Sequence, residues 1–309
     1  MNKEILPIAI VGAGPAGMTA AIYLARANAK FKIFDKGAPG GKMNITQLVD
    51  NYPGTKNVAG PELAFQMFEQ VRELGVEFEQ VEVHFISKEN DLFRIETDEG
   101  NFYSQAVIVA TGTQERRLKI PGEVKYTGRG VSYCAICDAT LYKEDAIAII
   151  GGGNAAIEEA VFVAKIVKKL YVIHRREEFR ADAALMDELR TYPNVEFILN
   201  AVPTEIYGDE AGVTGLGVKS LETDQVTTLD VKACFPFVGS DASTDFLSSF
   251  DVRDERGFVV VNEEMMTNVP GLFSVGDVNK KVLRQIVTAT NDGAIAALSA
   301  NRFVKRPLK

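Results

Sequence analysis

The chain has 309 residues, more than a single domain usually holds, so we expect two domains that each bury a core of their own. Hydrophobic residues make up 46% of the sequence and charged residues 25%, which excludes a disordered chain and is typical of globular proteins. The net charge of -8 excludes nucleic acid and anionic membranes as expected partners, because both repel an acidic protein.

The cysteine content and the apolar run near the N-terminus indicate in which cellular compartment the protein works. Three cysteines, two of them in one short motif, do not make the disulfide framework of a secreted protein, and a redox-active pair is typical of a reducing compartment. The apolar run at 5–11 resembles the core of a signal peptide, but glycines at 12, 14 and 17 interrupt it. No run reaches the roughly 18 apolar residues of a spanning helix. We therefore expect a cytoplasmic protein.

The first motif is a glycine turn between a strand and a helix. The run at 5–11 predicts a buried strand, three glycines spaced as Gly-x-Gly-x-x-Gly follow it, and residues 18–27 have helical composition. The first glycine of such a turn permits the bend, the second lets the backbone approach a pyrophosphate, and the third lets the helix pack on the strand. The next strand, 31–34, ends at an acid placed to bind a ribose. This predicts a dinucleotide site, with a purely structural turn as the alternative. The residues assigned to it are Gly12, Gly14, Pro15, Ala16, Gly17, Asp35 and Lys36.

Two segments between residue 40 and residue 112 are further candidates for backbone that lies close to a flat cofactor. Gly40 and Gly41 open a polar loop that runs to Asn51, for which a plain surface loop is the alternative. Alternating runs near 93–97 and 106–110 predict strands, and the second ends in Ala-Thr-Gly at 110–112. Between loop and strands, residues 61–74 predict an amphipathic helix with the core residues Leu63, Phe65, Met67, Phe68 and Val71.

The second motif is the pair Cys134 and Cys137, followed at once by Asp138. Two thiols at this spacing can close into a reducible disulfide, and such motifs lower the pKa of one thiol. The adjacent carboxyl can move a proton when the dithiol forms or breaks. Half of a zinc site is the alternative, but a structural zinc needs two more ligands, and the remaining cysteine and two histidines are scattered. We expect no metal, and we expect Cys234, in an apolar run, to be a small buried hydrophobe without a role.

A second glycine turn follows the dithiol. Residues 146–150 predict a strand, Gly-Gly-Gly-Asn-Ala-Ala follows at 151–156, and 157–168 predict a helix. The next strand, 170–173, ends in a histidine and a cluster of arginines where NAD sites carry an acid. Arginines there accommodate a 2′-phosphate, so NADPH is favoured over NADH. A solvated charged face with two neighbouring glutamates is the alternative. The residues assigned to this nucleotide are Gly151, Gly153, Asn154, Ala155, Ala156, His174, Arg175, Arg176 and Arg180.

The C-terminal part supplies an acid at a strand end. Residues 271–276 predict a strand that delivers Asp277 into a turn, where it can bind the ribityl hydroxyls of a flavin or simply cap the turn. A small-residue helix is predicted at 293–300. Two glycine turns with a dithiol before the second predict a path for electrons from nicotinamide through a flavin to a disulfide, because a hydride carrier and a thiol couple need such an intermediary.

The motifs together resemble one family. Gly-x-Gly-x-x-Gly at 12–17, Ala-Thr-Gly at 110–112, Cys-Ala-Ile-Cys-Asp at 134–138, the second glycine turn, His-Arg-Arg-x-x-Phe-Arg at 174–180, Gly-Asp at 276–277 and Arg-Gln at 284–285 occur in the order and spacing of low-molecular-weight bacterial thioredoxin reductases. The match spans essentially the whole chain. The cysteine motif between two nucleotide folds is its most specific part.

The resemblance implies an α/β protein of two Rossmann-like three-layer nucleotide-binding domains. The FAD domain would comprise 1–114 and 246–309, with the NADPH domain, 115–245, inserted into it. It also implies a homodimer and a large rotation between the domains. Cys137 would face the flavin, Cys134 would attack the thioredoxin disulfide, and Asp138 would be the acid. Further residues assigned to the flavin are Gly40, Gly41, Lys42, Asn51, Thr111, Gly112, Gly276, Asp277, Arg284 and Gln285.

The sequence departs from the family pattern at a few positions. Lys42 stands where glutamine usually follows the two glycines, and the pairs at 154–155 and 290–291 also differ from the usual residues. Arg129, Leu141 and Tyr142 are candidates for holding thioredoxin. Two other functions remain open: a flavin-dependent thioredoxin reductase that takes electrons from ferredoxin, and a non-catalytic redox sensor that holds FAD.

Overall fold

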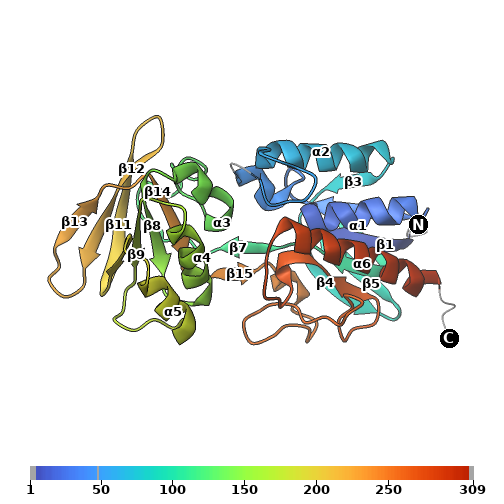
Figure 1. Cartoon of the computed structure of the whole chain (residues 1–309). Helices are drawn as coiled ribbons and strands as arrows, with labels where there is room; N and C mark the ends of the chain where they lie inside the picture. The colour runs from blue at the N-terminus through green and yellow to red at the C-terminus, as the bar shows by residue number, and fades with distance from the viewer. Residues whose placement is uncertain (1–4, 47–48, 306–309) are drawn as a thin grey trace. The chain divides into compact units, whose positions relative to one another are not determined.

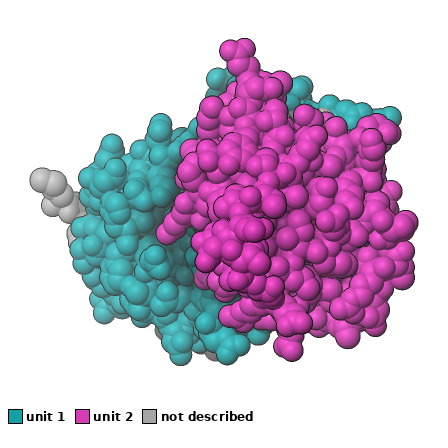
Figure 2. All heavy atoms as spheres, turned by 90° about the vertical axis from the view of Figure 1, so that its left-hand side faces the viewer, with its two compact units in different colours: residues 1–44, 52–114, 241–309 teal, residues 45–51, 115–240 magenta. Residues whose placement is uncertain are grey.

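The chain forms two compact units in a computed structural model that describes residues 5–46 and 49–305. Unit 1 comprises Met1–Asn44, Tyr52–Gln114 and Asp241–Lys309, and unit 2 comprises Ile45–Asn51 and Glu115–Ser240 (Figure 2). Each unit contains parallel strands and helices, in a mixed sheet in unit 1 and a fully parallel one in unit 2, so the predicted α/β class with two Rossmann-like folds is confirmed. The chain crosses between the units along β7 (Thr113–Glu115) and β15 (Ser240–Ala242), which pair as a two-stranded sheet.

Unit 1 is built on a seven-stranded sheet in the order β3-β2-β1-β6-β5-β4, with β16 paired to β6. Figure 1 labels β1, β3, β4 and β5 of this sheet. The pairings around β1 are parallel, and Ile10, near its C-terminal end, lies beside Ile33 on one neighbour and Ile108 on the other. All three side chains are buried, which explains the apolar run of the sequence. The strands are β1 (Ile5–Val11), β2 (Phe31–Asp35), β3 (Glu77–Gln80), β4 (Val83–Glu89), β5 (Leu92–Thr97), β6 (Gly100–Val109) and β16 (Leu272–Ser274).

The helices of unit 1 pack closely on one another at small residues. A Cβ atom at Gly293 would collide with the carbonyl oxygen of Ala16, so a glycine lets the last helix approach the first. That last helix is longer than the predicted 293–300. Phe65 is predicted to be a core residue, but its side chain is 61% exposed, so this prediction is wrong. The elements are α1 (Pro15–Arg26), α2 (Gly60–Glu73), α6 (Ile286–Lys305) and the 3₁₀ turns η1 (Gly41–Ile45), η3 (Asp245–Leu247) and η4 (Gly276–Val278).

Unit 2 combines a four-stranded parallel sheet, in the order β10-β9-β8-β14, with a three-stranded antiparallel sheet, β11-β12-β13. Its main core packs Ile149, Val172 and Phe235 of the parallel sheet against Ile157 and Ala160 of the helix that follows β8. The elements are β8 (Ala146–Gly151), β9 (Lys169–Ile173), β10 (Val195–Ile198), β11 (Ala201–Gly208), β12 (Val213–Ser220), β13 (Val226–Leu229), β14 (Ala233–Phe237), α3 (Ala135–Asp138), η2 (Ala139–Tyr142), α4 (Asn154–Ala164) and α5 (Ala183–Arg190).

Within the described residues, no helix has the length and apolar character that crossing a membrane requires.

Candidate active site

The first glycine turn connects β1 to α1 and has both packed and open positions. Gly12 adopts a φ of +109°, and a Cβ atom there would collide with the carbonyl oxygen of Ala110. Gly17 is equally closed, because a Cβ atom would strike the carbonyl oxygen of Gly12. A Cβ atom at Gly14 would meet nothing within 4 Å, and the φ of -74° at this position suits any residue. The turn therefore leaves open space at the position that the sequence assigns to a pyrophosphate.

Asp35, at the end of β2, is held against this turn. Its two carboxylate oxygens accept hydrogen bonds from the backbone N–H groups of Ala13, at 2.6 Å, and Gly37, at 2.9 Å. The carboxylate thereby lies beside the glycine turn, at the position where the sequence pattern predicts that a ribose binds. The neighbouring Lys36 instead forms an exposed ion pair with Glu82, at 3.1 Å.

The adjacent glycines Gly40 and Gly41 pack against the first glycine turn. The N–H of Gly40 donates to the carbonyl of Ala13 at 2.8 Å, and Gly41 lies so near that a Cβ atom would be 3.4 Å from Gly14. Both have positive φ, which favours glycine. The next residue, Lys42, donates from Nζ to the hydroxyl of Thr113 at 2.7 Å. Asn51 is exposed and belongs to the segment of the chain grouped with unit 2.

The Ala-Thr-Gly segment after β6 is fixed by a loop from the C-terminal part. Thr111 donates from its hydroxyl to the carbonyl of Ser243 at 2.8 Å, and the carbonyl of Gly112 accepts from the N–H of the same serine at 3.1 Å. Gly112 has a φ of +67° and open space around a Cβ position. Gly12, Gly41 and this segment all follow strands of one sheet, so their proximity comes from the fold.

The end of β16 completes the group in unit 1. A Cβ atom at Gly276 would lie 3.0 Å from the side chain of Ala16, which places this glycine beside the first turn of α1. Arg284 binds the carbonyls of Asp277 and Asn279 at 3.1 and 3.2 Å and covers the ring of Phe258 at 4.3 Å. Its guanidinium is therefore locked by backbone and ring contacts.

Two residues near Gly276 escaped the sequence analysis. The carboxylate of Asp292, on α6, accepts from the N–H of Gly276 at 3.0 Å and pairs with the ammonium of Lys281. Asp292 is buried, so the lysine balances a charge that would otherwise be costly there. Gln285 lies at the start of α6, where its N–H donates to the hydroxyl of Thr288 at 3.2 Å. No motif in the sequence distinguishes Asp292 from a surface helix residue.

The second glycine turn, between β8 and α4, repeats the pattern of the first. Gly151 is closed by Phe237, whose carbonyl oxygen would be 2.6 Å from a Cβ atom, whereas a Cβ atom at Gly153 would meet nothing within 4 Å. Asn154 is exposed and exchanges two hydrogen bonds with Asp182, at 3.0 and 2.9 Å. Ala155 is exposed and Ala156 is buried. The open position is again the second glycine of the motif.

His174, at the end of β9, is buried rather than displayed. Its ring covers Gly152, where a Cβ atom would collide with it, and stacks on Phe179 at 5.0 Å between centroids. Burial lowers the pKa of His174, and the positive charges of three nearby arginines lower it further, while a backbone hydrogen bond involving Glu178 acts in the opposite direction. His174 is therefore a neutral packing residue near neutral pH.

The arginine cluster is exposed. Arg175, Arg176 and Arg180 all face solvent, and the positive charge of each lowers the pKa of His174. Within the described part of the chain, none of the ion pairs joins them to Glu177 or Glu178, the partners of the alternative interpretation. The N–H of Arg180 donates to the carbonyl of Gly152 at 2.8 Å, which ties the cluster to the second glycine turn.

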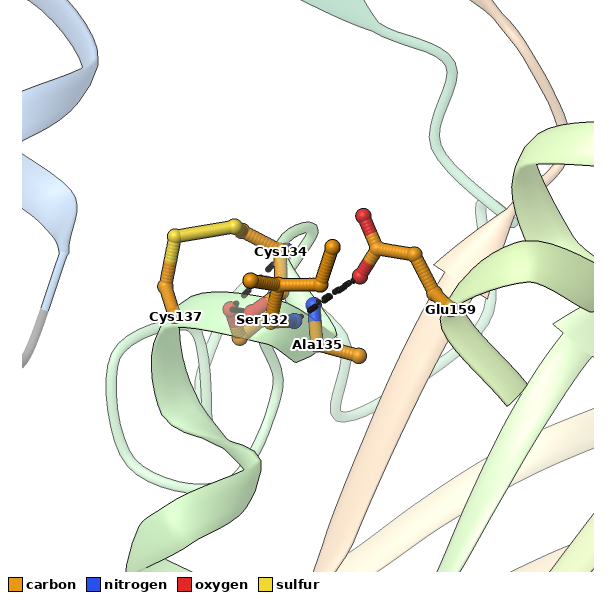
Figure 3. The surroundings of a disulfide bond; sticks show 6 residues. Ser132, Cys134, Ala135, Cys137 and Glu159 are labelled. Atoms are coloured by element: carbon orange, nitrogen blue, oxygen red, sulfur yellow. Dashed lines mark hydrogen bonds between the residues drawn. A yellow bond between two sulfur atoms is a disulfide. The ribbon is translucent and has the colours of Figure 1, made fainter. Parts of the chain in front are cut away.

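Cys134 and Cys137 form a disulfide in unit 2, with their Cα atoms 5.3 Å apart. Cys134 is the residue before the short helix α3, and Cys137 lies within that helix (Figure 3). Both side chains are partly exposed. The hydroxyl of Ser132 accepts from the N–H of Cys134 at 3.2 Å, which orders the entry into the turn. The predicted redox pair is thus closed in the oxidised form and reachable from solvent.

The surroundings of the disulfide are unevenly exposed. Asp138 is buried at 1% exposure, and Tyr142 packs into the core of unit 2 beside Phe235. Burial raises the pKa of Tyr142 to about 12, with the negative charges of Asp138 and a neighbouring acid as further causes. Leu141 is 46% exposed and Arg129 is exposed as well, so these two of the three candidate docking residues are accessible.

Glu159, on α4, was missed by the sequence analysis. Its Oε2 accepts hydrogen bonds from the N–H group of Ala135, at 2.6 Å (Figure 3), and from that of Ile136, at 2.9 Å. Burial raises the pKa of this carboxyl to about 7, although the two backbone bonds lower it. The only signal in the sequence is an acid in the helix after the second glycine turn, which alone indicates nothing.

The third cysteine and the histidines do not gather around the disulfide as a metal site. Cys234 is fully buried, as expected, and burial raises the pKa of its thiol to about 12. Among the residues that the structure describes, no group of three or more His, Cys, Asp and Glu side chains could hold a metal ion.

Both glycine turns fit a dinucleotide on their own geometry. In each, the first glycine is closed by packing, while the second glycine, Gly14 or Gly153, borders space that a Cβ atom could enter without contact. Each turn leads into the N-terminus of a helix, α1 or α4, where backbone N–H groups favour an anion. The residues present therefore fit two phosphate-bearing cofactors, one in each unit.

Comparisons with known proteins agree with this geometry. Residues 6–293 match the family model described as pyridine nucleotide-disulphide oxidoreductase. Thioredoxin reductase of Ureaplasma parvum serovar 3 is 40% identical over 309 residues, covering 99% of both chains, and that of Mycoplasma pneumoniae is 40% identical over 300 residues, covering 96% of this chain and 95% of the relative. The crystal structure of thioredoxin reductase from Streptococcus pyogenes has a TM-score of 0.92 at 38% identity and covers 97% of this chain and 98% of that one.

The chain belongs to the pyridine nucleotide-disulphide oxidoreductase family, a class of redox proteins. Within it, the relatives compared above are thioredoxin reductases matched along nearly their full length, which confirms the resemblance read from the motifs.

Proposed function

We propose that the protein is an NADPH-dependent thioredoxin reductase that holds FAD in unit 1 and NADPH in unit 2. One observation carries the proposal: the Cys134–Cys137 disulfide and a second, open glycine turn occur in the same unit, joined by the packing of α3 on α4. The names of the full-length relatives support thioredoxin as the partner. Bound FAD would supply the chemistry of accepting a hydride from NADPH and delivering two electrons to a disulfide.

In unit 1 the chain's part is to bind and orient. Gly14 leaves room for a pyrophosphate at the N-terminus of α1, and the fixed carboxylate of Asp35 can accept from a ribose hydroxyl. Lys42 replaces the glutamine usual in the family, and its ammonium can donate but not accept. The remaining residues proposed to line this site are Gly40, Gly41, Thr111, Gly112, Gly276, Asp277, Arg284 and Gln285.

In unit 2 the exposed arginines distinguish the two forms of the nicotinamide cofactor. Arg175, Arg176 and Arg180 present guanidinium groups that bind a phosphate in paired hydrogen bonds, and a 2′-phosphate is the group that NADPH has and NADH lacks. Gly153 leaves room for the pyrophosphate. The ring of His174 packs on Gly152, whose carbonyl accepts from the N–H of Arg180 at 2.8 Å.

At the dithiol the chain performs thiol–disulfide exchange. In the reduced form, the thiolate of Cys134 attacks a sulfur of the thioredoxin disulfide, forms a mixed disulfide and releases one thioredoxin thiolate. Cys137 then attacks the sulfur of Cys134, so the internal disulfide closes and the second thioredoxin thiolate leaves. Asp138 is the proposed acid for the thiolates that leave. The exposed Arg129 and Leu141 are proposed to hold thioredoxin.

We also propose a homodimer. Unit 1 exposes apolar side chains on three helices, including Phe65 at 61%, Tyr23 at 42% and Val287 at 42%. A cavity of about 600 Å³ lies among α1, α2 and α6 and is lined partly by Tyr23 and Val287. Such a surface supports an interface between two copies. Light scattering should give twice the 33.7 kDa mass of one chain, and a monomer at micromolar concentration contradicts this part of the proposal.

The electron donor is tested directly. The purified protein is mixed with NADPH, with NADH or with reduced ferredoxin in the absence of oxygen, and the visible absorbance of the flavin is followed. We expect rapid bleaching with NADPH and subsequent reduction of thioredoxin. A flavin that stays oxidised with NADPH but bleaches with ferredoxin rejects the proposed donor. Flavin bleaching without any reduction of thioredoxin supports the redox sensor instead.

A further inference from the structure

The helix that carries the dithiol lacks a cap of its own. The residue before α3 is Cys134, whose sulfur is in the disulfide and whose side chain makes no capping hydrogen bond. The first N–H groups of a helix have no partner within it and need an acceptor from elsewhere. Glu159 supplies that acceptor from α4, with one carboxylate oxygen 2.6 Å from the nitrogen of Ala135 and 2.9 Å from that of Ile136 (Figure 3).

This carboxylate lies close to the first cysteine as well as to the helix. The nitrogen of Ala135 is bonded directly to the carbonyl carbon of Cys134, so the charge lies one peptide group from the first cysteine. N–H groups at the start of a helix lower the pKa of a nearby thiol by stabilising its thiolate. Here two of those groups are bound to a carboxylate, whose own negative charge disfavours a neighbouring thiolate.

We propose that Glu159 is a positioning residue for the dithiol: its carboxylate anchors the turn to α4 and keeps the thiols of the reduced pair more protonated than the turn alone would. The anchoring follows from two hydrogen bonds that join segments 24 and 23 residues apart. Its effect on turnover rests on the proposed function, but its effect on the thiols does not.

Several charges act on Glu159 itself. Glu115, on β7, and Glu158, on the same helix, both oppose its ionisation, in addition to burial. The N–H groups of Ala135 and Ile136 favour ionisation. With a pKa raised to about 7, Glu159 changes charge near neutral pH, so part of its influence on the thiols should be lost as the pH falls through that value.

Alkylation of the reduced holoenzyme tests the charge effect. The protein is reduced with dithiothreitol, the reductant is removed, and the rate of labelling by iodoacetamide is measured against pH by mass spectrometry of the peptide with both cysteines. Glu159→Gln keeps an oxygen acceptor and removes the charge. We expect the midpoint of its profile to fall by about one pH unit relative to the wild type.

The control is Glu144→Gln, which removes one exposed carboxylate from the same unit, shortly after the dithiol in sequence. Its profile should coincide with that of the wild type. The buried thiol of Cys234 should remain unlabelled throughout. A Glu159→Gln profile that coincides with the wild type, in a variant that circular dichroism shows to be folded, overturns the charge effect.

A second variant tests the anchor. Glu159→Ala leaves both N–H groups without the acceptor, so we expect thioredoxin-dependent kcat to fall about tenfold with little change in the KM for NADPH. Wild-type turnover in this variant overturns the anchor. The proposed function and the proposed role of Glu159 can fail separately. If the wild type does not reduce thioredoxin but Glu159→Gln still shifts the alkylation profile, the proposed function is wrong and the role of Glu159 stands.

Discussion

The two glycine turns begin alike and end differently. Each closes its first position by packing and leaves its second glycine open, at Gly14 in unit 1 and Gly153 in unit 2. The following strand ends in Asp35 in unit 1, bound to the turn through Ala13, and in His174 in unit 2, which is buried and followed by exposed arginines. The shared part can hold a pyrophosphate, and the part that differs determines which nucleotide binds.

The largest expected effect tests the clearest difference between the units, the presence of thiols. All three cysteines of the chain lie in unit 2. Cys137→Ser breaks the internal exchange, so we expect thioredoxin-dependent turnover to fall by at least about a thousandfold, as when one member of a catalytic unit is removed. Bound FAD, measured by absorbance of the purified protein, should be unchanged. Cys234→Ser is the matched control, and turnover that survives Cys137→Ser contradicts the electron path.

The similarity of the two turns is tested at their open glycines. Neither Gly14 nor Gly153 needs a glycine conformation, and neither is crowded by protein, so alanine should leave thermal stability nearly unchanged. The added methyl would intrude on a bound pyrophosphate. We expect Gly14→Ala to weaken FAD binding about a hundredfold and Gly153→Ala to weaken NADPH binding alone by a similar factor.

Fluorescence titration of the apoprotein with FAD and the KM for NADPH measure these effects. Gly17→Ala provides the contrast, because its Cβ atom would strike backbone and should destabilise unit 1 by about 2 kcal/mol. If the two open-position variants exchange their effects, the assignment of nucleotides to units is reversed.

The difference between the ends of β2 and β9 is tested by removing one arginine. Arg176→Ala should raise the KM for NADPH about tenfold, because it removes hydrogen bonds between a charged donor and a phosphate. The KM for NADH should stay the same, since NADH has no 2′-phosphate. Steady-state kinetics with both cofactors supply their own control. Equal losses with NADPH and NADH would contradict a phosphate-binding role for the cluster.

The smallest expected effect concerns the pH dependence of stability in unit 2. Burial lowers the pKa of His174, so below the ordinary value of about 6.5 the unfolded chain binds a proton that the folded chain does not. His174 therefore contributes stability above that value and loses it as the pH falls. In His174→Gln the Tm should decline less on acidification. His84→Gln, a change at the exposed histidine of unit 1, should behave as wild type, and parallel Tm curves for all three proteins contradict this prediction.

Much of the candidate site could be predicted because its signals are local in sequence. A glycine turn needs its residues at fixed spacing after a strand, and a disulfide across two intervening residues needs only two cysteines, so Gly12 to Gly17 and Cys134 to Cys137 were found directly. The roles assigned to single residues in cofactor binding stay predictions. Asn154 and His174 contact protein groups that the sequence did not indicate.

Other features were beyond a sequence-based prediction. Phe65 has the helical spacing of a core residue but is 61% exposed, because spacing identifies the apolar side of a helix and not what covers it. Asp292 and Lys281 form a pair eleven residues apart with no recognisable motif. Acids and lysines are common on helices and loops, so composition does not reveal that this pair meets in the interior.

The sequence by itself determined the family, the two nucleotide folds and the redox pair, because each depends on residue types at short, fixed spacing. The tertiary structure alone decided that Glu159 caps the dithiol turn, that His174 packs against Phe179 and that Gly14 and Gly153 border open space. These facts depend on which distant segments meet when the apolar surfaces pack, and a linear pattern does not contain that information.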